Sequence, residues 1–271
     1  MNSCAPRVVA HRGASAQLAE HTLAAYVLAL EQGADGLECD VRMTRDGHLV
    51  CIHDRRIDRT STGRGAVDTM DLAALAGHDF GSWRDEPDGV DGMIDYPGHG
   101  RPHIRVLTLA ELLGLITDWP RPVQLFVETK HPARNSALVE VALVELLAQH
   151  GLTTPKSRED SQIVILSFSP RALRRVRAVA PALPTVALLP VLGRARSGEL
   201  APWVDIAGPR IGTIRADPDF VLRAAVHGYP TYCWTVDEPA DVALCAEIGV
   251  AYLATNRPAE TRELLGQGSG R

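Results

Sequence analysis

The sequence contains no apolar run that approaches the roughly 18 residues needed to cross a membrane, so no transmembrane segment is expected. It also lacks an excess of positive charge. The 28 Lys and Arg residues against 33 Asp and Glu give a net charge of −5, which argues against a nucleic-acid-binding protein. The stretch from Met1 to Ala10 is too short for a signal peptide before the first strand begins, so we expect no export.

Cysteine and lysine are scarce. The five cysteines are scattered and show no paired spacing: Cys4, Cys39, Cys51, Cys233 and Cys245. Two of them fall inside expected strands, which indicates reduced, buried thiols and a cytoplasmic protein. The basic residues are almost all arginine, and the only lysines are Lys130 and Lys156. Internal repeats and low-complexity tracts are absent as well.

What the chain does contain is an alternation of short β-rich runs with helical patterns. The expected strands are Arg7–His11, Gly36–Arg42, Pro122–Thr129, Ile163–Phe168, Pro184–Leu189, Val204–Ala207, Pro230–Val236 and Val250–Ala254. The expected helices are His21–Gln32, Leu109–Asp118, Ser136–His150, Arg171–Val179, Pro218–His227, Ala240–Ile248 and Ala259–Leu265. Eight βα units in about 250 residues are typical of a closed (β/α)₈ TIM barrel, an α/β fold. A doubly wound open sheet is the alternative, but the first strand is followed by His11-Arg12-Gly13-Ala14 and not by a glycine-rich dinucleotide loop.

We therefore predict one TIM-barrel domain spanning residues 1–271, with a hairpin and a loop insertion after the second strand. The insertion covers residues 54–106 and is rich in Gly, Asp, Pro and Arg. In a barrel this connection lies on the C-terminal face, where βα loops build active sites. Loops of this length are usually functional or flexible, and a surface ornament or an oligomer contact is the alternative reading.

The residues around position 40 predict a cation site. Glu38 and Asp40 are two apart in an apolar strand, so their side chains point to the same face about 6.6 Å apart along it. Glu128, at the end of the third barrel strand, supplies a third carboxylate at the same height. Without a Cys/His cluster, this set indicates Mg²⁺ or Ca²⁺ rather than zinc. The alternatives are an exposed salt-bridged pair for the first two acids and an ion pair with Lys130 for Glu128.

Two histidines and two cations are expected at the same rim. Asp46-Gly47 is a turn signal, and an antiparallel hairpin folded about residues 45–46 would place His53 opposite Glu38. His11 ends the first strand, so the two histidines on opposite sides of a bound cation are candidates for general acid and general base. Arg12 and Lys130 are candidates for phosphate or carboxylate clamps, or they simply neutralise the acids. Trp234 is expected to form a packed wall, with substrate stacking as its second possible role.

At these residues the sequence resembles the glycerophosphodiester phosphodiesterase family. The matching motifs are His11-Arg12-Gly13, Glu20-His21-Thr22, Glu38-Cys39-Asp40-Val41, Asp46-Gly47, His53-Asp54, Arg59-Thr60-Thr62-Gly63-Gly65, Leu107-Thr108-Leu109-Glu111, Glu128-Thr129-Lys130, Ser167-Phe168, Trp234-Thr235-Val236 and Thr255-Asn256-Arg257-Pro258. They follow one another along nearly the whole chain. His21 departs from the family, which usually has Asn there, and Ala251-Tyr252 replaces its Asp-Gly pair.

The resemblance implies a (β/α)₈ barrel that uses a divalent cation to hydrolyse glycerophosphodiesters to glycerol 3-phosphate and an alcohol. Carried over by position, it implies His11 and His53 as acid and base and Glu38, Asp40 and Glu128 as metal ligands. Arg12 and Lys130 would hold the phosphate. Two other functions remain open: a phospholipase D-like barrel lyase that acts on lysolipids or sphingolipids and yields a cyclic phosphate, and a barrel that only binds glycerophospho-compounds.

Overall fold

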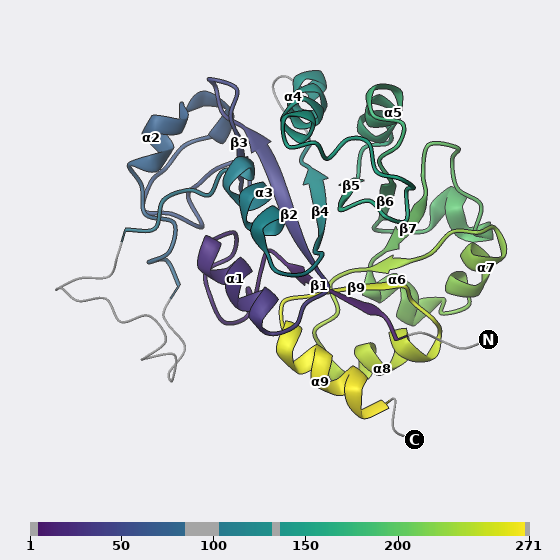
Figure 1. Cartoon of the computed structure of the whole chain (residues 1–271). Helices are drawn as coiled ribbons and strands as arrows, with labels where there is room; N and C mark the ends of the chain where they lie inside the picture. Colours follow the sequence, from purple (N-terminus) through teal and green to yellow (C-terminus); the bar gives the residue numbers. More distant parts are fainter. Residues whose placement is uncertain (1–4, 85–102, 132–135, 269–271) are drawn as a thin grey trace.

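The computed structural model describes residues 5–84, 103–131 and 136–268 of the 271-residue chain. Eight parallel strands form a nearly closed barrel with helices around its outside (Figure 1), which confirms the predicted TIM barrel. The barrel strands are β1 (Arg7–His11), β2 (Gly36–Met43), β4 (Gln124–Thr129), β5 (Ile163–Ser167), β6 (Thr185–Leu189), β7 (Ile206–Pro209), β8 (Tyr232–Cys233) and β9 (Tyr252–Thr255). They are hydrogen-bonded in the order β7-β6-β5-β4-β2-β1-β9-β8. Two isolated parallel bridges, Ala207 to Thr231 and Arg210 to Trp234, connect the two ends of that order beside β7 and β8.

One further strand and the helices occupy the connections. The strand β3 (Leu49–Cys51) pairs antiparallel with β2. The α-helices are α1 (Leu23–Glu31), α2 (Leu72–Ala76), α3 (Leu109–Asp118), α4 (Ser136–Gln149), α5 (Pro170–Val179), α6 (Ile211–Ala216), α7 (Phe220–Val226), α8 (Pro239–Glu247) and α9 (Pro258–Gly268). Two 3₁₀ segments, η1 (Val67–Thr69) and η2 (Gly193–Ser197), complete the set among the described residues.

Local signals explain where several helices begin. Thr108 and Glu111 form a reciprocal capping box at the start of α3. The α1 helix begins at Leu23 and not at the predicted His21, because Thr22 is its N-cap and accepts a hydrogen bond from Ala25 N. His21 itself has φ = 61°, which is incompatible with a helix.

Other boundaries differ from the prediction as well. The helix expected over Pro218–His227 is shorter, and the short helix α6 before it was not predicted. The strand expected over Pro230–Val236 is reduced to the two residues of β8. The next residue, Trp234, still forms an isolated parallel bridge with Arg210. Short elements of this kind carry too few residues to show a clear hydrophobic period.

The barrel interior is apolar below its mouth. Phe126 packs on Tyr232 with ring centroids 5.1 Å apart and meets Tyr252 edge-on at 5.2 Å. Phe126 lies two residues before Glu128 on the same face of β4, so this aromatic group underlies the position where the acids emerge. Gly13 allows the loop after β1 to close tightly on α1, since a Cβ there would lie 2.7 Å from the backbone carbon of Ala25.

The described part of the predicted insertion, residues 54–84 and 103–106, includes η1 and α2 and lies beside β3, to one side of the barrel (Figure 1). Its apolar side chains form a small core of their own with the end of the hairpin: Val50, Ile52, Ile57, Val67, Leu75, Phe80 and Val106. Residues 85–102 of the predicted insertion lie outside the described residues. The segment is therefore at least partly structured around the hairpin that carries His53.

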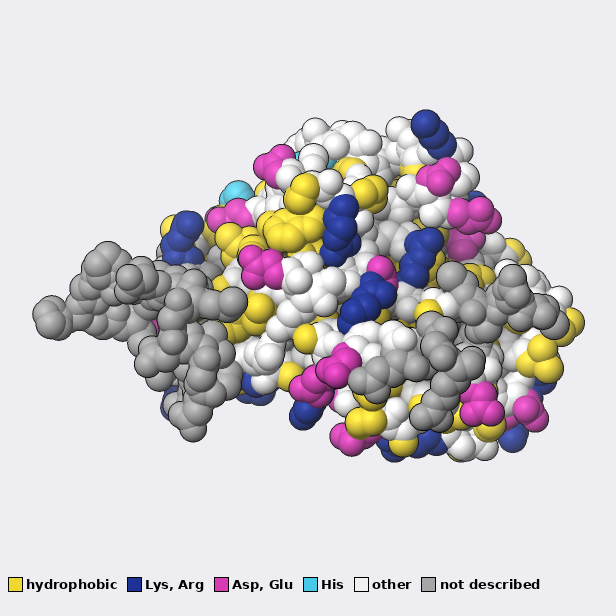
Figure 2. Space-filling view, turned by 60° about the horizontal axis from the view of Figure 1, so that its bottom comes forward, with side chains coloured by type: hydrophobic (Ala, Val, Ile, Leu, Met, Phe, Trp, Pro, Cys, Tyr) yellow, Lys and Arg dark blue, Asp and Glu magenta, His cyan; other side chains and the backbone are white. Residues whose placement is uncertain are grey.

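The surface carries mixed charges. On the face shown in Figure 2, Lys and Arg side chains are interspersed with Asp and Glu among the coloured residues. This pattern agrees with the net charge of −5 and with the lack of an excess of positive charge in the sequence. Within residues 5–84, 103–131 and 136–268, no helix has the length and apolar character needed to cross a membrane.

Candidate active site

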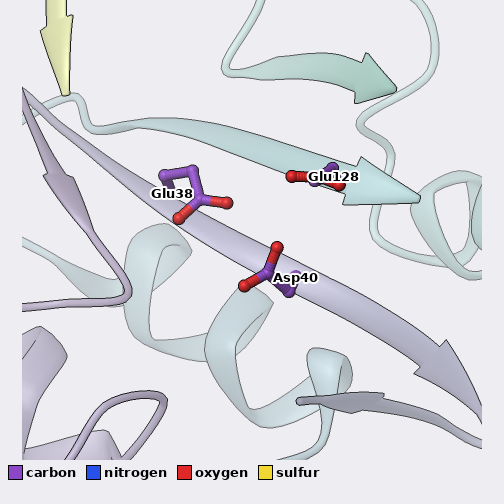
Figure 3. Close-up of side chains that lie close together, drawn as sticks. All are labelled: Glu38, Asp40 and Glu128. Atoms are coloured by element: carbon purple, nitrogen blue, oxygen red, sulfur yellow. The ribbon is translucent and has the colours of Figure 1, made fainter. Parts of the chain in front are cut away.

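Strand register brings three carboxylates to one place at the mouth of the barrel. In the parallel pairing of β2 with β4, Asp40 lies opposite Glu128, and in the pairing of β1 with β2, His11 lies opposite Glu38. Glu38, Asp40 and Glu128 are all buried, and each offers an oxygen that lies within 4.8 Å of those of the other two (Figure 3). Buried ligands that are all oxygen fit a hard divalent cation.

The three acids differ sharply in their electrostatics. Burial, followed by the nearby charge of Asp40, raises the pKa of Glu38 well above its usual range and raises the pKa of Glu128 to about 7. Burial also acts to raise the pKa of Asp40, but the charge of Lys130 and a hydrogen bond from His21 outweigh it and hold that pKa well below its usual range. The raised pKa values of Glu38 and Glu128 mean that these two carboxyl groups hold protons more tightly than usual, and a bound cation would displace those protons.

Two positively charged side chains contact these acids. Lys130 Nζ lies 2.8 Å from Asp40 Oδ1 and 2.7 Å from Glu128 Oε1. Arg12 Nε lies 3.0 Å from Asp40 Oδ2, and its Nη1 lies 3.0 Å from Glu20 Oε1. Both side chains thus balance the charge of the carboxylates, which is one of the two roles considered from the sequence. Their role as phosphate clamps stays a prediction.

His11 reaches the site from the end of β1. Its Nε2 lies 4.0 Å from Glu38 Oε2, and its Nδ1 lies 2.8 Å from Asn256 Oδ1. Burial and then the charge of Arg12 lower the pKa of His11 to about 4, although 18% of the side chain remains exposed. The ring is therefore neutral near pH 7, the form that can accept a proton.

The predicted hairpin forms, but its predicted register is wrong by one residue. β2 and β3 are antiparallel with Val41 opposite Cys51. Continued along the strand, this register places position 38 opposite Asp54, not opposite His53. His53 follows β3 and belongs to neither a barrel strand nor a helix, so the two histidines come from different elements as predicted.

The turn of this hairpin explains the shift. The prediction assumed a two-residue turn at 45–46. In the structure, Thr44 N donates a hydrogen bond to His48 O at 2.9 Å, and this bond closes a loop of three residues, 45–47. Gly47 is the last of the three and has φ = 88°, the left-handed conformation that closes three-residue hairpin loops. One additional loop residue changes which positions pair across the two strands.

His53 lies at the open edge of the site. Its Nδ1 is 2.6 Å from Asp54 Oδ1, while Arg59 Nε donates to Asp54 Oδ2 at 2.7 Å and holds that carboxylate in place. Burial is the main cause of a lowered pKa for His53, although 35% of the side chain is exposed. The ring lines a cavity of about 200 Å³ together with Glu128 and Lys130.

An aromatic pair bounds the same region. Phe168, after β5, lines the cavity and meets Trp234 edge-on with ring centroids 5.3 Å apart. Trp234 Nε1 donates to Gly208 O at 2.7 Å, which fixes the indole. Trp234 is therefore packed against Phe168, while its roles as a wall of the substrate site and in stacking on a substrate stay predictions.

Sequence reasoning assigned no role to several residues that support the site. His21 Nε2 lies 2.9 Å from Asp40 Oδ2, and its Nδ1 lies 2.8 Å from the hydroxyl of Tyr26. Asn256, beyond the last strand, contacts His11. His21 and Asn256 belong to motifs that carry the family resemblance, so their place in those motifs was the available signal.

Sequence comparison shows which known proteins this chain resembles. The model of the glycerophosphoryl diester phosphodiesterase family matches residues 11–260. A Mycobacterium tuberculosis protein named probable glycerophosphodiester phosphodiesterase 1 is 48% identical over 270 residues, covering 97% of this chain and 93% of the relative. The glycerophosphodiester phosphodiesterase of Bacillus subtilis is 33% identical over 92% of this chain and 83% of its own length.

Solved structures show the same fold. A putative glycerophosphoryl diester phosphodiesterase from Silicibacter pomeroyi superposes with a TM-score of 0.79 at 26% identity, covering 99% of this chain and 95% of the other. An Oleispira antarctica phosphodiesterase, solved with the product sn-glycerol-3-phosphate, has a TM-score of 0.77 at 24% identity and covers 97% of both chains. With the family model matching most of its length and relatives similar throughout, the chain belongs to the glycerophosphoryl diester phosphodiesterase family of enzymes.

Proposed function

We propose that the chain hydrolyses glycerophosphodiesters to glycerol 3-phosphate and an alcohol, with His11 and His53 as acid and base beside a divalent cation held by Glu38, Asp40 and Glu128. The observation that carries the proposal is the convergence of these three buried acids within 4.8 Å at the rim that both histidines occupy. The family membership of the chain supports the same reaction.

The carboxylates suit Mg²⁺ or Ca²⁺, since both cations prefer oxygen ligands. When bound, such a cation would neutralise charge on the non-bridging oxygens of a phosphodiester and favour attack at phosphorus. Arg12 and Lys130 lie against the same carboxylates and would contribute further positive charge toward the phosphate.

Proton transfer is the task of the two histidines. One imidazole removes the proton of the nucleophile, which is water or a hydroxyl of the substrate, and the other donates a proton to the departing alkoxide. In-line displacement requires these groups on opposite sides of phosphorus. The placement of His11 at the end of β1 and of His53 in the loop after β3 supports this division, because the two rings approach the acids from different segments of the chain.

The remaining surroundings suit a small organic phosphate. The cavity of about 200 Å³ beside His53 and Lys130 would receive part of the substrate. Phe168 lines this cavity, and Trp234 packs against Phe168 and would support that wall.

Cys39, Cys51, Cys233 and Cys245 are free and buried, in keeping with the expected cytoplasmic setting. We further propose that residues 1–271 act as one domain.

A turnover panel tests this function. The purified chain is incubated with glycerophosphodiesters of choline, ethanolamine, inositol and glycerol, in EDTA and then with Mg²⁺ or Ca²⁺ restored. We expect release of glycerol 3-phosphate only when the cation is present. Full activity of a metal-free preparation would contradict the cation's role. A cyclic phosphate as the stable end product, detected by ³¹P NMR, would instead identify a lyase.

A further inference from the structure

Asn256 lies beside His11 because the first and last strands of the barrel are neighbours. β1 and β9 pair in parallel with Ala10 opposite Thr255, which places the next residue of each strand side by side at the mouth. Asn256 Oδ1 is 2.8 Å from His11 Nδ1. The hydroxyl of Ser15 lies 2.7 Å from the same amide oxygen.

A carboxylate fixes the orientation of this amide. Asn256 Nδ2 donates to Asp237 Oδ2 at 2.6 Å, and Asn256 N donates to Asp237 Oδ1 at 2.7 Å. Thr255 Oγ1 donates to the same Oδ1 at 3.0 Å. An ionised carboxylate only accepts hydrogen bonds, so the amide must turn its NH₂ toward Asp237 and its oxygen toward His11.

The amide oxygen in turn determines the tautomer of His11. An oxygen that only accepts requires a proton on Nδ1. In the neutral ring, Nε2 then has its lone pair free, and Nε2 is the atom that lies 4.0 Å from Glu38 Oε2. The hydrogen bonds from Asp237 through Asn256 to His11 therefore leave the unprotonated Nε2 of His11 on the side of the three carboxylates.

We propose that Asn256, oriented by Asp237, is a positioning residue that holds His11 as the Nδ1-protonated tautomer with Nε2 available for proton transfer. This inference rests on the proposed function, since it assigns His11 a proton to move. It differs from the arrangement at the second histidine, where His53 Nδ1 meets the carboxylate of Asp54 directly. A neutral amide supports the neutral ring without adding a negative charge beside it.

The tautomer can be measured directly. The full chain is labelled with ¹⁵N-histidine, and long-range ¹H–¹⁵N correlation spectra are recorded near neutral pH, with His11 assigned from the spectrum of His11→Gln. We expect the wild-type ring to show the Nδ1-protonated pattern. A wild-type His11 protonated on Nε2 would overturn the inference without any further variant.

Two variants test whether the residues act through His11. In Asn256→Ala and Asp237→Asn we expect the Nδ1-protonated signal to weaken. With Asn256→Ala, kcat should fall about 10- to 100-fold at nearly unchanged KM, a part of the roughly 10²–10⁴-fold that a general acid or base contributes. In a double-mutant cycle, Asn256→Ala should have no further effect once His11 is glutamine.

Asp241→Asn is a matched control four residues beyond Asp237. It makes the same change at a buried carboxylate that pairs with Arg215 and is not part of the contacts to His11. We expect lower stability with an unchanged His11 spectrum and unchanged kcat. An equal loss of kcat in this control would mean that Asn256→Ala and Asp237→Asn act only through general destabilisation, and it would overturn the inference.

The outcomes also separate this inference from the proposed function. If His11→Gln is inactive but Asn256→Ala keeps both the wild-type tautomer and the wild-type kcat, the positioning role is refuted and the proposed function stands. If His11→Gln keeps full activity with Mg²⁺ or Ca²⁺, the role of His11 in the proposed function is refuted, and the positioning role is refuted with it.

Discussion

Replacing Lys130 by Met removes the ammonium group that lies between two of the three buried acids. Lys130 Nζ contacts both Asp40 and Glu128 at less than 3 Å, and only 9% of the lysine side chain is exposed. Methionine keeps the length and apolar stem of lysine but carries no charge. In the absence of metal, the variant therefore leaves two carboxylates facing each other across β2 and β4 with less positive charge beside them.

We expect Lys130→Met to lower the free energy of unfolding substantially. Removing one partner of a buried ion pair typically lowers the free energy of unfolding by about 3–5 kcal/mol. The neighbouring Arg12, 3.0 Å from Asp40, keeps part of the balance, so we expect the lower end of this range. A bound divalent cation should restore much of the loss, since it supplies positive charge at the same carboxylates. Metal at 100 times its Kd would stabilise the native state by about 2.7 kcal/mol through binding alone.

Urea unfolding followed by circular dichroism, in EDTA and in Mg²⁺ or Ca²⁺, measures both effects. Lys156→Met is the matched control, since it makes the same substitution at the other lysine, whose side chain is exposed, and should change stability by less than about 0.5 kcal/mol. Equal losses of stability in Lys130→Met and Lys156→Met would refute the role of Lys130 in balancing the charge of Asp40 and Glu128. A failure of both cations to stabilise either the wild type or Lys130→Met would refute the carboxylate site.

Further variants separate the roles within the site and test the fold. Glu38→Gln should weaken metal binding by about tenfold or more, since it removes an anionic ligand, whereas His53→Ala should bind metal normally and lose turnover; calorimetric titration would show His53 to be a ligand if both variants lose the metal. Burial acts to raise the pKa of Glu20, but hydrogen bonds from Arg59 and the charge of Arg12 outweigh it and lower that pKa from its ordinary 4.5 to about 2. The stability that ionised Glu20 contributes is therefore present above pH 4.5 and lost as the pH falls toward 2. Urea midpoints at pH 7 and pH 3 should therefore differ less in Glu20→Gln, and an undiminished difference would contradict this. Phe126→Ala should lower the free energy of unfolding by about 3–5 kcal/mol through the cavity it leaves, and a loss below 1 kcal/mol would show that the barrel interior repacks.

Local patterns in the sequence were sufficient to predict the barrel and the acid cluster. The period of two along a strand places Glu38 and Asp40 on one face, and this holds whatever the rest of the chain does. The alternation of strands with helices favours parallel pairing, and in a parallel barrel every strand ends at the same mouth. Glu128 could therefore be assigned to the same cluster from its position at a strand end alone.

Register and short elements were predicted less well. The hairpin register depends on a left-handed Gly47 and a third loop residue, and the sequence Asp46-Gly47 is equally compatible with a two-residue turn. The short helix α6 and the two-residue strand β8 have too few residues for periodicity to distinguish them from loops. These features follow from how neighbouring segments pack and not from the local pattern.

The contacts that orient the site were decided by the tertiary structure alone. Asn256 meets His11 across 245 positions of sequence because the last barrel strand pairs with the first. Lys130 could be read from the sequence as a phosphate ligand or as a counterion, and only its position between Asp40 and Glu128 shows that it balances the acids. The sequence by itself determined which residue types reach the mouth of the barrel. Which of them touch one another depends on barrel closure and side-chain direction, because those contacts join segments that no local pattern relates.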